Sequence, residues 1–235
     1  MRTKTLLLTA ALSAAGLLPS MAQVFSVNAV GYVNQTIPAN GYAIVANPLN
    51  GNPDNNVNTI LQLPNDGSYD GAGIYRFNPS TQGYRDTMQW VSGAGWLASD
   101  PADLVVAPGE GFFLQNVAGS PLNVTFVGEV PSGTTHNPIL GSGKYQIRSA
   151  IVPKGLPIGW VGLANSLGFP AATGDSLFIF DKNTQSYKDT VQYVDGAGWL
   201  SSDYPPEGPT IDPGTGFFVQ KVDVNADWAM TFSVN

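Results

Sequence analysis

The sequence of 235 residues contains no cysteine and only one histidine, His136. Without cysteine the chain can form no disulfide bond, so its stability must come from an apolar core, which a domain of about 100 residues can build. The common zinc sites are excluded as well, because they are assembled from several cysteine and histidine ligands.

Charge is also scarce. Charged residues make up 11% of the chain, well under half the usual share of about 25%. The chain has 10 Lys and Arg residues against 17 Asp and Glu, which gives a net charge of −7. Such a surface repels nucleic-acid phosphates and anionic lipid headgroups. We therefore expect no nucleic-acid partner and no binding to a membrane surface.

The N-terminus has the three-part layout of a secretory signal peptide over residues 1 to 22. Arg2 and Lys4 form a positive start, residues 6 to 18 form an apolar run, and SMA at 20 to 22 fits a small-x-small cleavage site. The run is short for a membrane span, which needs about 20 apolar residues. We expect a secreted, extracellular or periplasmic chain that begins at Gln23 and does not insert into a membrane after cleavage. An uncleaved anchor is the alternative.

Two blocks of the sequence occur twice in the same order. Residues 77 to 100 (FNPSTQGYRDTMQWVSGAGWLASD) match residues 180 to 203 (FDKNTQSYKDTVQYVDGAGWLSSD) at 15 of 24 positions. Residues 107 to 117 (APGEGFFLQNV) match residues 212 to 222 (DPGTGFFVQKV) at 7 of 11 positions. Since units of this length can each hold a core, the repetition indicates two homologous units in tandem.

Weaker matches extend the repeat: GYAIVANPL at 41 to 49 aligns with GWVGLANSL at 159 to 167, and VTFVG at 124 to 128 echoes MTFSV at 230 to 234. We therefore predict a first unit over residues 23 to 130 and a second over residues 141 to 235. The segment from 131 to 140 (PSGTTHNPIL) is mostly polar, with two prolines, and predicts a connector.

Both units have the pattern of short strands. Residues alternate with a period of two from Tyr84 to Val91 and again from Tyr187 to Val194. Pro-Gly pairs at 108 to 109 and at 213 to 214 suit type II turns, because proline fixes φ and glycine tolerates a positive φ. Short strands with frequent turns are typical of a sandwich or barrel. The predicted fold is all-β, with two tandem, homologous β-sandwich or barrel-like units.

One short helix is expected, in the first unit only. Residues 55 to 63 follow Asp54, a favourable N-cap residue. Their pattern places Val57, Ile60 and Leu61 on one face of the helix. The second unit lacks this insertion.

The motifs VNAVGYVN, PANGYAIVANPL, APGEGFF and the terminal TFSVN resemble those of a family of secreted, duplicated β-repeat proteins of unassigned function from environmental bacteria. More loosely, each unit is similar to a bacterial extracellular repeat that ends on a Pro-Gly-x-Gly-aromatic strand. The resemblance covers nearly all of the chain after the leader and implies secretion and a β-rich fold. It supplies no catalytic residues, and the two copies depart from each other at Pro48 and Ser166.

Catalytic motifs are sparse. GDSL at 174 to 177 matches the signature of a serine esterase family, but a nucleophilic serine needs a histidine to activate it. His136 precedes the serine, whereas that family carries its histidine near the C-terminus. Asp86 and Asp189 recur, and paired carboxylates can cleave glycosides. They fall in different units, so hydrogen bonds to backbone are the simpler interpretation. We expect no catalytic activity.

No cofactor is expected, although calcium stays open because it needs only oxygen ligands. The candidate segments are residues 50 to 58 (NGNPDNNVN) and 65 to 70 (NDGSYD). Neither has the spacing of an EF-hand loop, and Asn, Asp and Gly are ordinary turn residues. We interpret both segments as turns.

Recurring aromatic residues give a better candidate site. Tyr84 and Trp96 recur as Tyr187 and Trp199. Exposed rings among polar side chains would suit flat sugar faces or a protein partner. Buried rings would fill the cores, and we favour this interpretation for the two tryptophans.

The sequence thus predicts an exported, non-catalytic β-repeat protein with a structural, cell-surface or adhesive role. A carbohydrate-binding module is the main alternative, and an extracellular hydrolase is the third. The expected partner is a polysaccharide or a cell-surface protein. Buried rings favour the first hypothesis, coplanar exposed rings favour the second, and an acidic pocket with Asp86 or Asp189 would favour the third.

Overall fold

A computed structural model of the chain describes residues 29 to 234. The expected signal peptide over residues 1 to 22 and the mature terminus at Gln23 lie outside the described residues. Within the described range the chain is nearly all β and has one short α-helix, so the predicted all-β class is confirmed. No helix in that range has the length and apolar character that a membrane crossing requires.

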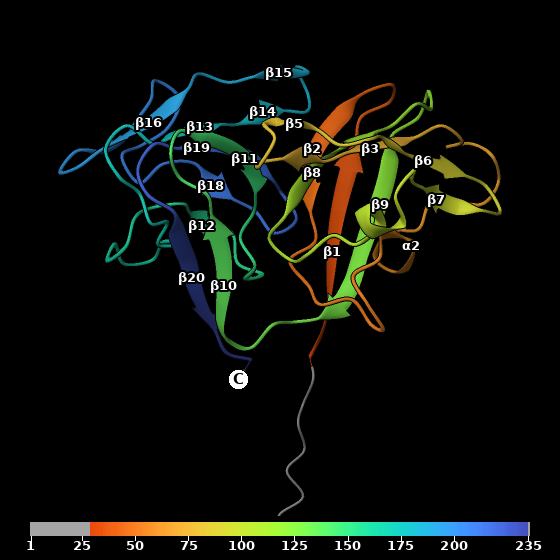
Figure 1. Ribbon diagram of the computed structural model, residues 1–235, viewed down its shortest axis with the longest axis horizontal. Helices are drawn as coiled ribbons and strands as arrows, with labels where there is room; N and C mark the ends of the chain where they lie inside the picture. The colour runs from red at the N-terminus through yellow and green to blue at the C-terminus, as the bar shows by residue number, and fades with distance from the viewer. Residues whose placement is uncertain (1–28, 235) are drawn as a thin grey trace, which may run out of the picture.

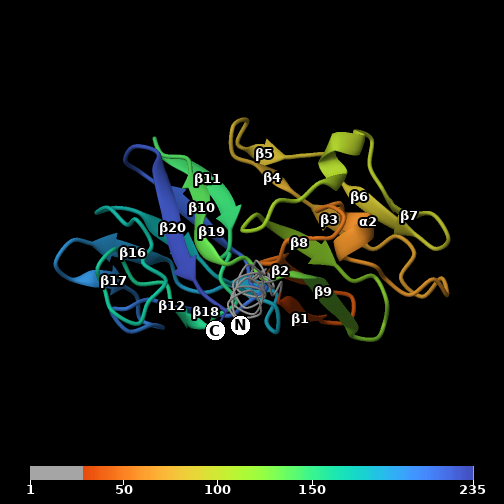
Figure 2. The ribbon, with the colours of Figure 1, turned by 90° about the horizontal axis from the view of Figure 1, so that it is seen from below.

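Two halves of the chain lie side by side (Figures 1 and 2). The first half contains β1 (Val30–Ile37), β2 (Tyr42–Ala46), α2 (Val57–Ile60), β3 (Gly73–Tyr75), β4 (Phe77–Asn78), β5 (Gly83–Tyr84), β6 (Met88–Val91), β7 (Gly95–Leu97), the 3₁₀ helix η1 (Pro101–Leu104), β8 (Gly111–Gln115) and β9 (Leu122–Glu129). The second half contains β10 (Gly133–Ile139), β11 (Lys144–Arg148), β12 (Leu156–Pro157), β13 (Ser176–Phe178), β14 (Phe180–Asp181), β15 (Ser186–Tyr187), β16 (Val191–Val194), β17 (Gly198–Leu200), β18 (Thr210–Ile211), β19 (Phe217–Lys221) and β20 (Ala226–Phe232).

The two halves share one topology, except that the second half has one further strand pair, β12-β18. Each has a five-stranded antiparallel sheet, in the order β2-β8-β3-β6-β7 in the first half and β11-β19-β13-β16-β17 in the second. Each also has a two-stranded ribbon, β1-β9 or β10-β20, and a hairpin, β4-β5 or β14-β15. The repeated sequence blocks therefore lie on corresponding strands.

Each ribbon packs its apolar side against the inner face of its five-stranded sheet. In the first half, Phe126 of β9 joins a core cluster with Phe112 and Trp96 of the sheet. In the second half, Trp228 of β20 joins Phe217 and Trp199 in the same way. The alternation of strands explains this arrangement, because every second side chain points into the layer between ribbon and sheet.

The expected connector is instead mostly a strand. Residues 133 to 139 form β10, which pairs with β20 over seven residues, from Gly133 opposite Phe232 to Ile139 opposite Ala226. Burial explains the difference, because Asn137 and Ile139 point inward while His136 and Pro138, which alternate with them, are exposed. The second half thus begins near residue 131 and not at 141.

Two further expectations need correction. The alignment of residues 41 to 49 with 159 to 167 is wrong, because the edge strand that matches β2 is β11, which pairs with β19 as β2 pairs with β8. The helix is shorter than residues 55 to 63, and its N-cap is Asn56, whose side chain accepts a hydrogen bond from the Asn58 backbone. Asp54 supports this cap by accepting a hydrogen bond from the Asn56 backbone.

Candidate functional site

The two halves meet at a cluster of aromatic residues, which we call the seam. Six rings form a closed circuit in which neighbouring ring centroids lie between 5.2 and 6.5 Å apart. In order around the circuit they are Phe113, Phe180, Tyr187, Phe218, Phe77 and Tyr84. Each half contributes three rings at corresponding positions, so the halves are related by an approximate twofold axis.

Two pockets flank this circuit. Pocket A has a volume of about 510 Å³ and is lined by Phe77, Gln82, Tyr145, Phe178, Tyr187 and Phe218. Pocket B has a volume of about 400 Å³ and is lined by Phe180, Gln185, Tyr42, Tyr75, Tyr84 and Phe113. The six positions correspond one to one between the halves. Each pocket takes four residues from one half and two from the other half's hairpin, so neither half alone forms a complete pocket.

Two glutamines hold the hairpins across the seam. The Gln82 side-chain nitrogen donates to the Tyr145 carbonyl (3.0 Å), and its oxygen accepts from the Tyr145 N–H (2.9 Å). Gln185 makes the same pair of bonds with the backbone of Tyr42, at 2.9 and 2.8 Å. Because Tyr42 and Tyr145 lie on edge strands, each glutamine amide satisfies backbone groups that a neighbouring strand would otherwise pair.

The Pro-Gly turns also cross the seam. Gly109 and Gly214 have φ values of 83° and 82°, and each turn closes with the hydrogen bond expected of a type II turn. The Gly109 carbonyl accepts from Ser149 of the second half (2.9 Å), and the Gly214 carbonyl accepts from Ala46 of the first (3.0 Å). The predicted turns are therefore present and bind the opposite half.

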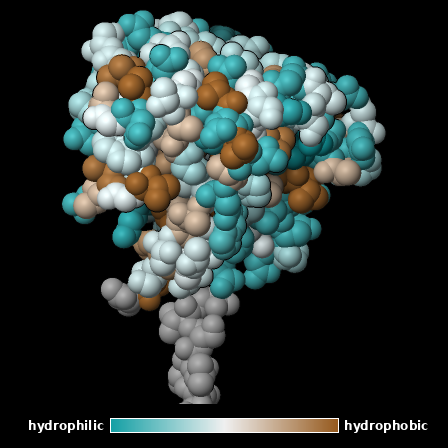
Figure 3. Space-filling model, turned by 60° about the vertical axis from the view of Figure 1, so that its left-hand side comes forward, coloured by the Kyte–Doolittle hydropathy of each residue, from teal (hydrophilic) through white to brown (hydrophobic). Residues whose placement is uncertain are grey.

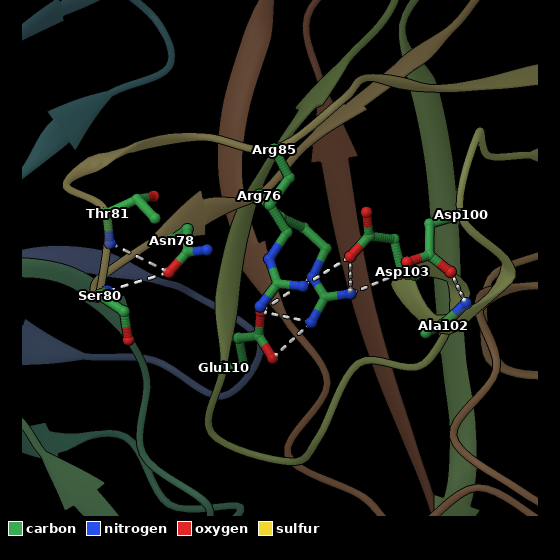
Figure 4. Close-up of polar contacts among 9 residues, drawn as sticks. All are labelled: Arg76, Asn78, Ser80, Thr81, Arg85, Asp100, Ala102, Asp103 and Glu110. Atoms are coloured by element: carbon green, nitrogen blue, oxygen red, sulfur yellow. Dashed lines mark hydrogen bonds and ion pairs between the residues drawn. The ribbon is translucent and has the colours of Figure 1, made fainter.

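A cluster of charged residues fixes the β4-β5 hairpin on the first half (Figure 4). Arg76 is 5% exposed and donates from two nitrogens to the Glu110 carboxylate, at 2.9 Å each. Arg76 and Arg85 also both contact Asp103 of η1. Within the hairpin turn, the Asn78 side chain accepts from the Ser80 backbone at 2.9 Å. These contacts hold in place the strands that carry Phe77 and Tyr84.

The matching hairpin β14-β15 has lighter support. Ile179 and Lys188 occupy the positions of Arg76 and Arg85, and the Lys188 ammonium lies 5.6 Å from the ring centroid of Tyr204. A cavity of about 250 Å³ opens here, with Thr215 in the place of Glu110. The two sides of the seam therefore share a shape but differ in charge.

Two tyrosines of the seam have raised pKa values. Burial raises the pKa of Tyr84 above its ordinary value. Burial raises the pKa of Tyr187 further, and the neighbouring Tyr84 adds to the shift. A phenol with the ordinary pKa of about 10 is already protonated at neutral pH, so each O–H can donate a hydrogen bond to a ligand, and the raised pKa extends this to more alkaline pH.

The structure divides the four sequence-predicted site residues. Tyr84 and Tyr187 are 53% and 46% exposed and line pockets B and A. Trp96 and Trp199 are each 1% exposed, and their ring nitrogens donate to the Leu61 and Gly159 carbonyls. The two tryptophans fill the cores, as the favoured interpretation expected, and line neither pocket.

Sequence reasoning missed most of the pocket. Gln82 and Gln185 recur in the repeated block, and their positive φ values of 57° and 55° mark them as turn residues. Their recurrence at a turn was the available signal, since a solvated turn does not require glutamine. Tyr42 and Tyr145 could not be matched because the upstream alignment was out of register.

The residues considered for catalysis are not assembled into a site. Ser176 is 6% exposed and its hydroxyl contacts the Gly174 carbonyl, while His136 pairs with Asp227 on the β10-β20 ribbon. Asp189 accepts a hydrogen bond from Ser202 at 2.6 Å. Neither it nor Asp86 lines a pocket of the seam.

The segments considered for calcium form turns. Asp66 accepts a hydrogen bond from the Ser68 backbone, and this bond lowers the pKa of the Asp66 carboxyl. Asp70 accepts one from the Ser92 backbone at 2.7 Å. Among residues 29 to 234 there is no group of three or more His, Cys, Asp or Glu residues arranged to hold a metal ion.

Comparisons with known proteins assign no identity to this site. No family model matches the chain, and neither a curated protein nor a solved structure is detectably similar to it. The resemblance to secreted repeat proteins therefore stays a prediction, and the function must be argued from the pockets.

Proposed function

We propose that the chain is an exported, non-catalytic protein with an adhesive role, and that pockets A and B each bind a neutral polysaccharide. The observation that carries the proposal is the pair of concave aromatic pockets built from corresponding residues of the two halves. A binding site is typically a mostly apolar concavity with a few polar groups that fix orientation.

The lining residues suit a sugar. Aromatic rings offer apolar faces to the C–H faces of a pyranose, and the neutral phenols and glutamine amides can hydrogen-bond to its hydroxyls. Neither pocket is lined by a charged side chain, and the net charge of −7 disfavours anionic polysaccharides. The rings are inclined to one another, as between Tyr42 and Tyr75 at 55°. The pockets are open hollows, and their inclined rings would contact a sugar from more than one side.

The arrangement also suits adhesion. The hairpins that line the pockets lie at the upper end of the molecule in Figure 1, whereas the start of β1 and the end of β20 lie at the lower end. A chain held by either end would present both pockets outward. Two sites on one molecule also strengthen attachment to a repetitive polymer through their high effective concentration.

Affinity electrophoresis in gels containing cellulose derivatives, xylan, mannan or β-1,3-glucan tests the proposal, with alginate as an anionic comparison. We expect retardation by at least one neutral polymer, a smaller effect for Tyr84→Ala or Tyr187→Ala, and none for the double variant. Tyr32→Ala is the matched control, because Tyr32 is 69% exposed on β1, outside both pockets. Binding to none of the neutral polymers, or unchanged binding by the double variant, would overturn the proposal. Capture of a cell-surface protein through the same tyrosines would replace it with a protein partner.

A further inference from the structure

We infer that each pocket is one end of a longer track that binds a linear, neutral polysaccharide across all five strands of its sheet. This inference rests on the proposed function, and it names the substrate as an extended chain and not a single terminal sugar.

The track in the first half is a row of residues that lie opposite one another on neighbouring strands. Reading across the outer face, Tyr42 pairs with Gln115, Gln115 with Gly73, Gly73 with Gln89, and Gln89 with Leu97. Tyr42 belongs to pocket B, so the row begins inside the pocket and ends at edge strand β7.

The second half carries the same row. Tyr145 pairs with Gln220, Gln220 with Ser176, Ser176 with Gln192, and Gln192 with Leu200. This row begins in pocket A at Tyr145. Both rows thus have tyrosine, glutamine, a small residue, glutamine and leucine in the same order.

The rows face away from the cores. Gln89 lies between buried Met88 and Trp90 on β6, so its own side chain points to the opposite face. Gln192 lies between Val191 and Tyr193 in the same way. At the far end, Leu97 and Leu200 are 49% and 48% exposed. Solvent-facing strand positions do not require leucine, and here the leucine provides an apolar contact at the end of each row.

The glutamines have hydrogen-bonding capacity to spare. Tyr75 donates to the side-chain oxygen of Gln115 at 2.7 Å, which orients the amide and leaves its nitrogen free. Gln220 donates its nitrogen to the Gly143 carbonyl at 3.2 Å and keeps its oxygen free. The amides of Gln89 and Gln192 make no hydrogen bond within residues 29 to 234. Each row therefore offers several donors and acceptors to the hydroxyls of a ligand.

The length and charge of the row identify the occupant. Five strands at a spacing of about 4.8 Å give a row of about 19 Å, which is longer than one sugar ring. No position of either row is charged, although the chain as a whole carries −7, so a neutral chain matches this face and an anionic one is repelled. The middle position of each row is small and buried, since a Cβ at Gly73 would lie 3.0 Å from the Tyr75 ring and Ser176 is 6% exposed. A ligand would therefore pass over the side chains that flank this position and not touch it directly.

Figure 3 shows one face of the molecule. On the face shown, apolar residues are scattered among polar ones and do not merge into one broad patch.

The test compares short and long oligosaccharides of the polymer that binds the full chain. Isothermal titration with its disaccharide and hexasaccharide is run on the unmodified chain and on the double variant Gln89→Ala, Gln192→Ala. We expect the hexasaccharide to bind the unmodified chain more tightly than the disaccharide. The double variant should lose about tenfold in hexasaccharide affinity, as expected for lost hydrogen bonds, and keep its disaccharide affinity. Gln62→Ala is the control, because Gln62 is an exposed glutamine outside both rows.

The outcomes separate this inference from the proposed function. Equal hexasaccharide affinities in the double variant and the unmodified chain would overturn the track while pocket binding stands. Two results together would support both pocket binding and the track. The variant Tyr84→Ala, Tyr187→Ala should lose affinity for both oligosaccharides, and the variant Gln89→Ala, Gln192→Ala should lose affinity for the hexasaccharide only. Concentration-dependent dimers that dissociate in the glutamine variant would assign the rows to a second copy of the chain and overturn the inference.

Discussion

Gly111 and Gly216 lie against each other across the seam. A methyl group added to Gly111 would lie 3.5 Å from the Cα atom of Gly216 and 2.5 Å from the Ile147 side chain. A methyl group added to Gly216 would lie 2.6 Å from the Ile44 side chain. The requirement for glycine here is space, since the halves approach too closely at this point for any side chain.

Gly111→Ala should therefore destabilise the protein by separating the halves. The added methyl overpacks the seam, and we expect a loss of about 1–3 kcal/mol in the free energy of unfolding. Urea unfolding followed by tryptophan fluorescence measures it. Gly119→Ala is the control, because a Cβ there meets no atom within 4 Å. Equal midpoints for the two variants would contradict the close approach.

The Pro-Gly turns give a second prediction. Gly109→Val forces a β-branched residue into a positive φ, which costs about 1–3 kcal/mol. Its Cβ would also lie 2.6 Å from the Asn137 side chain in the other half. Gly143 has a φ of 75° but nothing within 4 Å of an added Cβ. Gly143→Val should therefore show the strain alone and lower the melting temperature less than Gly109→Val. A larger decrease in melting temperature for Gly143→Val than for Gly109→Val would argue against a contact between the Gly109 turn and the opposite half.

A third prediction concerns the buried ion pair. Glu110→Gln removes the carboxylate that binds two nitrogens of buried Arg76 and leaves it the longer ion pair with Asp103 at 3.9 Å, so we expect a loss of about 3 kcal/mol. Burial lowers the pKa of the nearby Arg148 guanidinium, and the negative charge of Glu110 opposes this lowering. Arg148 loses that opposing charge in the variant as well. Thr215→Val at the corresponding position of the second half should change the unfolding free energy by less than about 1 kcal/mol. Denaturation curves that rank these variants in the other order would refute the role of the cluster.

Alkaline pH gives a fourth prediction. The folded-state pKa values of Tyr84 and Tyr187 lie above the ordinary 10.0, so the folded chain keeps protons that the unfolded chain has lost. The resulting stability is complete below the ordinary value and falls as pH rises through the folded-state pKa. The variant Tyr84→Phe, Tyr187→Phe should lose less stability than the unmodified chain between about pH 8 and about pH 11. Thermal melts at both pH values check this, with Tyr32→Phe as control. Parallel losses in all three proteins would count against it.

A fifth prediction concerns the second half alone. A fragment of residues 131 to 235 retains β10 and should fold, whereas one of 141 to 235 lacks the partner of β20 and leaves Trp228 uncovered. The longer fragment should also dimerise, because Gln185 of one copy can bind the Tyr145 backbone of the other as Gln82 does here. Circular dichroism and size-exclusion chromatography measure both properties. A disordered or strictly monomeric longer fragment would argue against a self-complementary seam.

The fold class was predictable from the sequence because strand alternation and Pro-Gly turns are local signals. Both turns have the predicted geometry, and the short helix lies within the predicted segment. The strand expected from Tyr84 to Val91 is interrupted after Tyr84, so β5 and β6 are separate. This break explains why Tyr84 is exposed while Met88 and Trp90, which share its parity, are buried.

The seam could not be predicted in the same way. Contacts such as that between Phe113 and Phe218, whose ring centroids lie 6.3 Å apart, join residues remote in sequence. Adjacent aromatic pairs at 112 to 113 and 217 to 218 did indicate that one ring of each pair must face away from its own core. What covers the outward ring depends on how the halves dock, and periodicity within one half carries no information about that.

Each pocket includes two residues from the hairpin of the opposite half. A substitution in one hairpin should therefore weaken binding in the pocket that is formed mainly by the other half. Phe77 and Gln82 belong to the first half but complete the pocket whose other four walls come from the second. A substitution in the hairpin of one half can therefore leave the fold of that half and its own four pocket residues intact, and still abolish binding in the pocket formed mainly by the other half. The repeated sequence does not supply two self-sufficient binding units. It supplies two incomplete ones, each of which is finished by the other.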